Sequence, residues 1–340
     1  MTTKSDVEEV QNYFSPGLTG ASVNCVVGST GVGRTALLSG IAAQLMLELK
    51  QSTMNSIRPK LVVFNVGGTE SEFYCLLRDC VAIQLHLSGL QSKECVDTVS
   101  IRNLDKSLLD AASRIIVRHI EPVNIAIKPG TVRKDLVEDW RKSIYTMQVM
   151  GGSVKGIIFD NFLTYCRMTT RHSDFGEHYV ETSKCIKDNL LLLKGIRDQL
   201  RIPIWIDCDR PGKFAQRNPK LKPSVTETAD CRFLHEHVDR LFSIGNQFEG
   251  RISRLDQLKP VRKDWLLVNL IERGVFAKCS AESRARFLNR GVVQPTLQIE
   301  QPILESIEEQ RRIDDITESV ARHATRGRSR RIMQIDETEF

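Results

Sequence analysis

The chain has 340 residues, of which 41% are hydrophobic and 26% are charged, and its formal net charge is +6. These values are typical of a globular protein with one large core domain and appendages. No apolar run reaches the roughly 18 residues that a membrane span needs, and the polar first residues lack the apolar region of a signal peptide. We therefore expect a cytoplasmic protein with no membrane partner.

The positive charge and the cysteines place mild limits on function. A net charge of +6 permits a polyanionic partner without requiring one. The excess is uneven, because seven arginines lie between Arg311 and Arg331. The nine cysteines include no CxxC pair, so we interpret them as reduced, buried thiols rather than as zinc ligands or disulfides.

Strand and helix signals alternate along the chain. Residues 1–20 are predicted to be a lead-in with a turn at Ser15-Pro16-Gly17. Short apolar runs rich in β-branched residues predict strands at 22–27, 61–66, 114–120, 155–162, 202–209, 237–245 and 265–274. Apolar residues at helical spacing predict helices at 35–50, 70–90, 136–150 and 177–200.

This alternation predicts an α/β fold with a doubly wound, mostly parallel sheet and flanking helices. We expect the core domain to span residues 21–298. Residues 299–340 are polar and arginine-rich. They are predicted to form a charged tail that is helical at 301–322 and disordered beyond.

A glycine-rich loop joins the first predicted strand to the next helix. It reads, in order, Gly28, Ser29, Thr30, Gly31, Val32, Gly33, Arg34 and Thr35. This matches the phosphate-binding pattern G-x-x-x-x-G-K-[ST] except at one position. Backbone N–H groups of such a loop surround phosphates, and the helix N-terminus adds a positive dipole end. We therefore predict that ATP or another NTP binds here, the alternative being a glycine-rich turn without a ligand.

Two further features of this region concern the chemistry. Arg34 stands where the pattern has lysine, and its planar, longer guanidinium does not replace a compact ammonium conservatively. We expect nucleotide binding to survive while the transition-state contact is impaired. The Thr35 hydroxyl is a predicted Mg²⁺ ligand. Asp160, at the end of the run 155–160, is predicted to be the Walker B aspartate that holds Mg²⁺ through water.

Segments further along resemble the C-terminal ATPase domain of DnaB-family replicative helicases of phage or bacterial type. Leu193–Pro203 is similar to that family's LK-x-LA-x-EL-x-VP segment. The next strand sits where the family has S-Q-L-x-R, with Arg210 matching the arginine and Asp207 at the place of the glutamine sensor. The segments 226–230, 238–243 and 268–274 resemble S-D-L-R, A-D-x-V-L-x-L and K-x-R-x-G, respectively. The resemblance covers roughly residues 15–295 and implies a RecA-like P-loop ATPase with a divergent active site.

The resemblance also assigns catalytic roles. Arg273 matches the arginine that reaches the γ-phosphate bound by the neighbouring subunit, whereas Ile271 replaces the family's lysine. Gly67 occupies the slot of the catalytic glutamate, so Glu70 or Glu72 must position the attacking water, and we select Glu70. The alternative is that both acids face solvent at a helix N-terminus, where acidic side chains are favoured.

Two basic segments are candidates for nucleic-acid contacts. One is 167–176. The other is 210–222, where the resemblance places a channel loop and where the candidate residues are Arg210, Lys213, Arg217 and Lys220. Basic side chains in a pore neutralise phosphates without reading sequence. We expect single-stranded DNA as the partner, with RNA as an alternative. Two solvated loops are the other interpretation, and the arginine-rich tail is a less specific contact.

Together these features predict an NTP-dependent, DnaB-like hexameric helicase or translocase. It would act on single-stranded nucleic acid, with replication proteins as partners, in a bacterial or phage-infected cell. The rival hypothesis is a nucleotide-binding RecA-like regulator or assembly scaffold with weak or no hydrolysis, because Arg34, Gly67, Asp207 and Ile271 all depart from the family pattern. A recombinase or packaging ATPase shares the same core and remains a third hypothesis.

Overall fold

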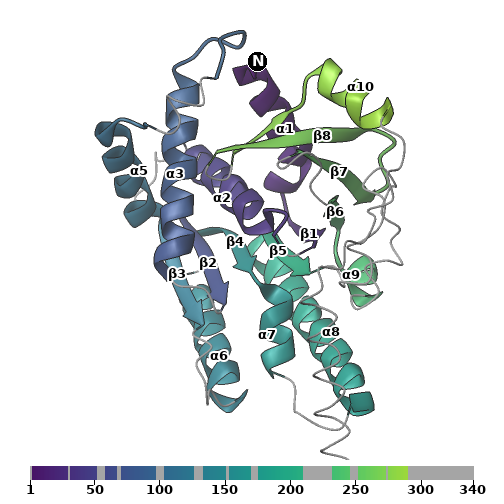
Figure 1. Cartoon of the computed structure of the whole chain (residues 1–340). Coiled ribbons are helices and arrows are strands. Elements are labelled where there is room, and N and C mark those ends of the chain that lie inside the picture. The colour runs from purple at the N-terminus through teal and green to yellow at the C-terminus, as the bar shows by residue number, and fades with distance from the viewer. Residues whose placement is uncertain are drawn as a thin grey trace, which may run out of the picture. The chain divides into compact units, whose positions relative to one another are not determined.

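A nine-stranded sheet forms the centre of the computed structural model, in the order β3-β2-β4-β5-β1-β6-β7-β8-β9 (Figure 1). The strands β3 to β6 of this order are parallel, and β7, β8 and β9 extend the sheet in antiparallel fashion. The strands are β1 (Ser22–Gly28), β2 (Lys60–Val66), β3 (Ile120–Ile125), β4 (Val154–Asp160), β5 (Pro203–Asp209), β6 (Arg240–Ile244), β7 (Ile252–Lys259), β8 (Trp265–Glu272) and β9 (Val275–Lys278).

The structure describes most of the first 289 residues. The described ranges are 2–29, 31–51, 58–66, 70–96, 103–125, 133–150, 153–169, 175–209, 232–245, 252–272 and 275–289. Within them the helices are α1 (Lys4–Leu18), α2 (Arg34–Gln51), α3 (Glu70–Ser88), α5 (Lys106–His119), α6 (Arg133–Met150), α7 (Phe162–Thr169), α8 (Phe175–Leu200), α9 (Arg232–His237) and α10 (Ala281–Asn289). None of these helices is long and apolar enough to cross a membrane.

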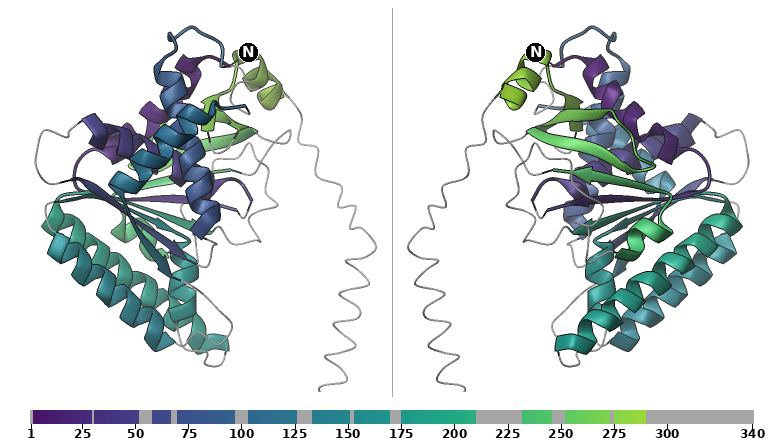
Figure 2. Two further views of the ribbon diagram at one scale, coloured as in Figure 1. Left: turned by 90° about the vertical axis from the view of Figure 1, so that its left-hand side faces the viewer. Right: turned by 90° about the vertical axis from the view of Figure 1, so that its right-hand side faces the viewer.

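Helices cover both faces of the sheet, as Figure 2 shows. Helices α1, α2, α3 and α5 pack on one face around Trp205, and α6, α7, α8 and α9 pack on the other face around Ile204 and Ile206. Successive side chains of a strand point to opposite faces, so a strand covered on both sides is expected to be mostly apolar. Strand β1 is accordingly buried at every position. The predicted α/β, doubly wound, mostly parallel sheet is confirmed.

Helix α1 replaces the predicted turn at Ser15-Pro16-Gly17, which was wrong. The helix begins with a capping box, in which Thr3 and Asp6 bind each other's backbone N–H groups. It ends against the core: Trp205 Nε1 donates to the Gly17 carbonyl oxygen at 3.0 Å, and Phe14 lies edge-on to Trp205 with ring centroids 5.9 Å apart. The apolar side of this N-terminal helix therefore packs in the hydrophobic core.

The predicted strand at 114–120 was also wrong over most of its length. Residues 114–119 end helix α5, and strand β3 begins only at Ile120. The buried residues of α5 are Ala112, Ile115, Ile116 and His119, a spacing of three and four that follows one helix face. The β-branched residues misled the prediction, because the helical period extends upstream of them.

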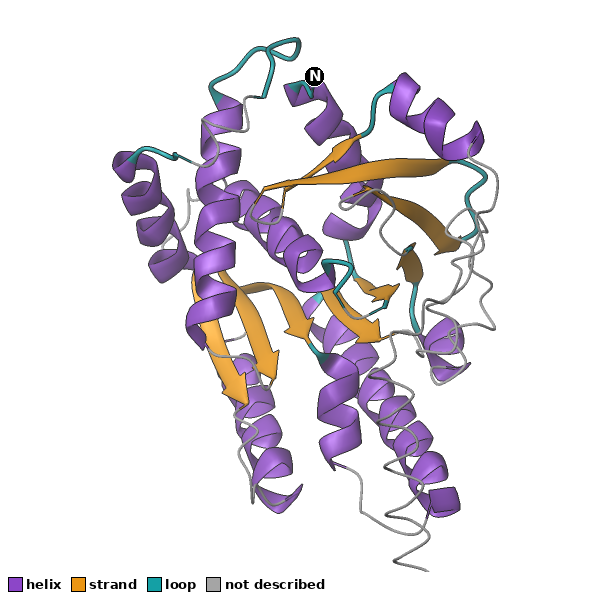
Figure 3. Ribbon diagram, viewed as in Figure 1, coloured by secondary structure: helices purple, strands orange, loops and turns teal. Residues whose placement is uncertain are grey.

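The other strands and helices predicted between residues 21 and 289 are confirmed to within a few residues (Figure 3). The predicted tail at 299–340, with its helix at 301–322, lies outside the described residues. The antiparallel β7 and β9 were not predicted. Of the eight described cysteines, Cys25, Cys80, Cys166 and Cys208 are buried. The prediction of burial was wrong for Cys75 and Cys95, which are exposed.

Candidate functional site

The predicted phosphate loop and both predicted acids lie at one edge of the sheet. Strands β1, β4 and β5 are parallel, so their carboxyl ends meet at the same edge. Gly28 ends β1 level with Asp209 of β5, and Asp160 ends β4 level with Asn65 of β2. The carboxyl edge of parallel strands is where α/β proteins bind ligands. The fold therefore places the loop where a nucleotide is expected.

The loop has the backbone geometry that phosphate binding needs. Gly31 and Gly33 have φ angles of 82° and 94°, in the left-handed region that favours glycine. A Cβ atom on Gly28 would lie 2.6 Å from Ile244 Cγ2, so only glycine fits at the end of β1. The Ser29 hydroxyl is buried without a hydrogen-bond partner among the described residues. A buried hydroxyl without a partner suits a loop that receives a polar ligand. Thr30, the next residue of the loop, lies outside the described residues.

Thr35 and Asp160, the two predicted Mg²⁺ ligands, are in contact. Thr35 Oγ1 donates to Asp160 Oδ1 at 3.1 Å, and Asp160 is 2% exposed. Asn161, with φ of 60°, donates from its side chain to Asp160 Oδ2 at 3.3 Å. Burial, and after it the negative charge of Asp207, raise the pKa of Asp160. A hydroxyl beside a carboxylate in need of a counter-charge is a donor set that fits Mg²⁺.

Arg34 is held by two carboxylates from β5. Its Nη1 lies 3.1 Å from Asp207 Oδ2, and its Nη2 contacts Asp209 Oδ1. The Arg34 side chain is 10% exposed, the Asp207 side chain 0% and the Asp209 side chain 27%. Burial raises the pKa of Asp207, and Arg34 works against this shift. In this conformation the positive charge of the loop is neutralised by the protein itself.

Asp207 is further fixed by the end of β4. The Asn161 backbone N–H donates to Asp207 Oδ1 at 2.5 Å. The other oxygen, Oδ2, accepts no hydrogen bond within the described part of the chain, so Arg34 holds it by charge rather than by an aligned hydrogen bond. The sequence placed Asp207 here as a sensor. The structure brings it together with the phosphate loop and Asp160, and its catalytic role stays a prediction.

Asp209 is a member of this site that the sequence analysis missed. Besides Arg34, it lies 3.5 Å from Arg167 Nη1 on α7. The signal was present in the order Asp207-Cys208-Asp209, because residues two apart on a strand point to the same face. Trp205, two residues earlier, packs on the face covered by α2, which is the face from which Arg34 approaches.

The structure does not describe the side chains of several other predicted site residues. Glu70 begins α3, but its side chain and that of Glu72 lie outside the described residues, as does Gly67. Arg273 and the whole segment 210–222, with Arg210, Lys213, Arg217 and Lys220, also lie outside them. In the segment 167–176, the side chain of Arg167 is described.

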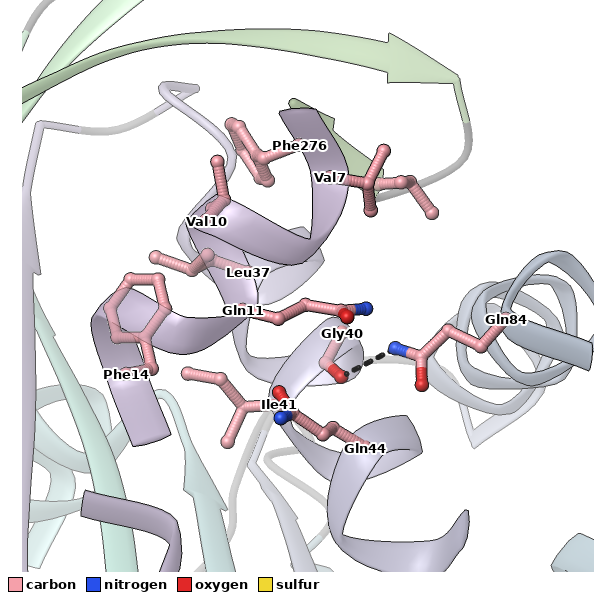
Figure 4. A pocket seen from close by; sticks show the side chains of 11 residues that line it. Val7, Val10, Gln11, Phe14, Leu37, Gly40, Ile41, Gln44, Gln84 and Phe276 are labelled. Carbon is pink, nitrogen blue, oxygen red and sulfur yellow. Dashed lines mark hydrogen bonds between the residues drawn. The ribbon is translucent and has the colours of Figure 1, made fainter. Parts of the chain in front are cut away.

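Other hollows of the described structure lie away from the phosphate loop. One of them, between α1, α2, α3 and β9, has a volume of about 40 Å³. Figure 4 shows its lining side chains, among which Gln84 donates to the Gly40 carbonyl oxygen. This volume has room for a few water molecules only. A wider groove between α3, α5 and β3 is lined by Tyr74, Val117 and Pro122, among others, and shares no residue with the phosphate loop.

The sheet order, the flanking helices and the glycine-rich loop after β1 define an α/β fold of the RecA-like ATPase type. The chain is similar to the solved "ATPase Domain of G40P", with a TM-score of 0.51 and 13% sequence identity over 76% of this chain and 85% of that chain. At this identity the likeness shows the fold. No protein-family model and no curated protein matches the chain.

Proposed function

We propose that the protein binds a Mg²⁺–nucleoside triphosphate, ATP or another NTP, at the loop 28–35. The contact between Thr35 and Asp160 carries this proposal, because it joins the loop to the acid that would hold the metal. The left-handed glycines at 31 and 33 support it, as does the Ser29 hydroxyl, which has no hydrogen-bond partner among the described residues. Loop N–H groups would bind the phosphates, and the metal would neutralise charge on the leaving and transferred groups.

We further propose that nucleotide hydrolysis drives movement along single-stranded nucleic acid, as in a DnaB-like helicase or translocase. Three roles rest on the family resemblance. Glu70 would position the attacking water, Arg273 would act across a subunit interface in a hexamer, and the basic segment 210–222 would face the strand. The likeness to the ATPase Domain of G40P supports the ATPase core that this reading needs.

A second candidate function is a nucleotide-binding regulator or assembly scaffold with weak or no hydrolysis. The specific observation in its favour is the pairing of Arg34 with Asp207 and Asp209. A basic group that is already held by carboxylates stabilises less of the negative charge that develops on a phosphoryl group during its transfer. Under this hypothesis nucleotide binding would change the conformation or assembly of the protein without sustained turnover.

One measurement separates the two functions. Steady-state release of phosphate from ATP is measured with and without single-stranded DNA, beside binding of a fluorescent ATP analogue in the presence of Mg²⁺. A motor should show turnover that single-stranded DNA stimulates. Saturable binding without stimulated turnover would select the scaffold, and no saturable binding by the wild type at millimolar nucleotide would contradict both.

A further inference from the structure

The positive group of the phosphate loop already has anionic partners in this structure. Arg34 Nη1 lies 3.1 Å from Asp207, and Nη2 is in contact with Asp209. We infer that Asp209 sets the nucleotide affinity of this protein, because the phosphates must take Arg34 from it. This inference rests on the proposed nucleotide binding. It adds a residue, Asp209, that lowers the affinity for the nucleotide.

The two carboxylates do not play the same part. The Asp207 side chain is fully buried and accepts the Asn161 backbone N–H at 2.5 Å, so it belongs to the framework of the strand ends. Asp209 is 27% exposed and lies in register with Gly28, at the level where β1 passes into the loop. Asp209 is therefore the partner that Arg34 can exchange for a phosphate.

Charge makes the exchange costly for the ligand. A phosphate oxygen that contacts Arg34 would come close to the Asp209 carboxylate, and two like charges repel at short range, most of all where water is partly excluded. Asp209 thus opposes binding in two ways: it occupies the guanidinium, and it repels the group that would replace it. Removing its charge should relieve both effects.

Arg167 remains as a positively charged partner of Asp209 after Arg34 has moved to a phosphate. Its Nη1 is 3.5 Å from Asp209 Oδ2, whereas Arg34 contacts Oδ1. A carboxylate that keeps one cation is not left unpaired, so the exchange avoids the large penalty of an isolated buried charge. The two arginines therefore bind opposite oxygens of one carboxylate, and nucleotide is expected to displace only Arg34.

The test is Asp209→Asn in the full chain, titrated with a fluorescent ATP analogue and Mg²⁺. We expect the affinity to rise about tenfold over the wild type, in line with loss of one partly buried charge pair. Thermal stability should fall at the same time, because the variant loses an ion pair. A merely structural role for Asp209 would lower stability and affinity together, so opposite directions distinguish the two.

Two controls complete the experiment. Asp198→Asn removes the same charge from an Arg–Asp pair on α8 with Arg197, and should leave nucleotide affinity unchanged. Arg167→Gln removes the other partner of Asp209 and should not tighten binding. If Asp209→Asn and the wild type bind saturably with affinities within twofold, or if Arg167→Gln tightens binding equally, the inference is overturned while the proposed function stands. If neither the wild type nor Asp209→Asn binds, the proposed nucleotide binding fails and the inference with it. Binding by Asp209→Asn alone would support the inference and contradict nucleotide binding as a function of the wild type.

Discussion

Arginine at position 34 differs from lysine in what it can hold at once. The planar guanidinium reaches Asp207 and Asp209 with two different nitrogens, whereas a lysine ammonium is a single compact charge. Lysine at this position would lack the two separated nitrogens that hold both carboxylates in this way, which should leave the loop more available to phosphate. The phosphate-binding pattern itself has lysine there.

We therefore expect Arg34→Lys to raise turnover by about tenfold, provided that the rest of the site is competent. Steady-state phosphate release at saturating Mg²⁺–ATP measures the effect. Arg34→Ala is the matched control and should turn over no faster than the wild type, because it removes the charge altogether. A loss of activity in Arg34→Lys would mean that the site is built around arginine, and the argument for a degenerating active site would be wrong.

Asp160 makes stability depend on pH. Burial and the charge of Asp207 raise its pKa in the folded protein above the ordinary value of about 4. The folded state thus binds the proton more tightly than the unfolded state. Its stabilising contribution is complete below about pH 4 and is lost as pH rises through the raised pKa of the folded state.

Asp160→Asn should accordingly stabilise the nucleotide-free protein by about 1–2 kcal/mol at about pH 8 and change it little at about pH 4. Urea unfolding at the two pH values measures the difference. Mg²⁺–nucleotide should stabilise the wild type more than the variant, because the wild type keeps the metal-binding carboxylate. Destabilisation of the variant at the higher pH would contradict this account of Asp160.

At the scale of elements, the end of α1 depends on a close approach of backbone to core. A Cβ atom on Gly17 would lie 2.6 Å from Trp205 Cζ2 and 2.9 Å from Asn24 Oδ1. Trp205 is fully buried and stacked on Phe242 with ring centroids 5.5 Å apart, so it has little room to yield. Overpacking of this kind costs about 1–3 kcal/mol.

We expect Gly17→Ala to lower the free energy of unfolding by that amount, as measured by urea denaturation. Gly195→Ala is the matched control, because Gly195 lies within helix α8 and its Cβ would meet nothing within 4 Å. That control should be neutral or stabilising by up to about 1 kcal/mol, the usual gain of alanine over glycine in a helix. Equal effects of the two substitutions would refute the close-packing explanation.

The elements show which parts of the fold the sequence predicts. Strands such as β1 and β5 are buried at nearly every position because both faces are covered, and their runs of apolar residues are visible locally. Helix α1 has a weak local signal, since Pro16 suggests a break and Trp205, which anchors its end, lies far along the chain. The segment 114–119 combines β-branched residues with a helical period. Packing of Ile115 and Ile116 against the helices of one face favours the helix there.

The candidate site divides in the same way. The loop 28–35 and Asp160 follow from local patterns at strand ends. Arg34 and Asp209, which form an ion pair, are 175 positions apart in the sequence (209 minus 34). No spacing rule predicts such a pair; it follows from placing β5 beside β1 in parallel register, which only the folded sheet supplies.

At the scale of the whole molecule, the resemblance to DnaB-family ATPases predicts an assembly. An arginine at position 273 that serves a neighbour's nucleotide has a role only if subunits associate. We expect light scattering in the presence of Mg²⁺–ATP to show a species well above the 38.5 kDa of one chain, consistent with a hexamer. Arg273→Ala should keep nucleotide binding while lowering turnover. A strict monomer in every nucleotide state would remove both the ring and the arginine in trans.

Nucleic-acid binding is the property that most separates a motor from a scaffold, and the basic segment 210–222 is its strongest candidate. If the segment lines a channel, its side chains meet backbone phosphates. Binding of single strands should then be independent of sequence and should weaken steeply with salt, because each neutralised phosphate releases counterions. The arginine-rich stretch from Arg311 to Arg331 is a second basic segment that would give the same salt dependence.

Replacing Lys213, Arg217 and Lys220 together by alanine removes three candidate phosphate contacts. The slope of log K against log salt should shrink in magnitude by about 2, at about 0.7 for each contact with a single strand. Nucleotide binding should stay unchanged, since the phosphate loop is a different element. Fluorescence anisotropy of a labelled oligonucleotide across a salt series measures the slope, and a chain truncated after Gln310 is measured beside it. If truncation abolishes binding while the triple variant keeps the wild-type slope, the contact belongs to the tail. The strongest reason to call the protein a motor would then be gone.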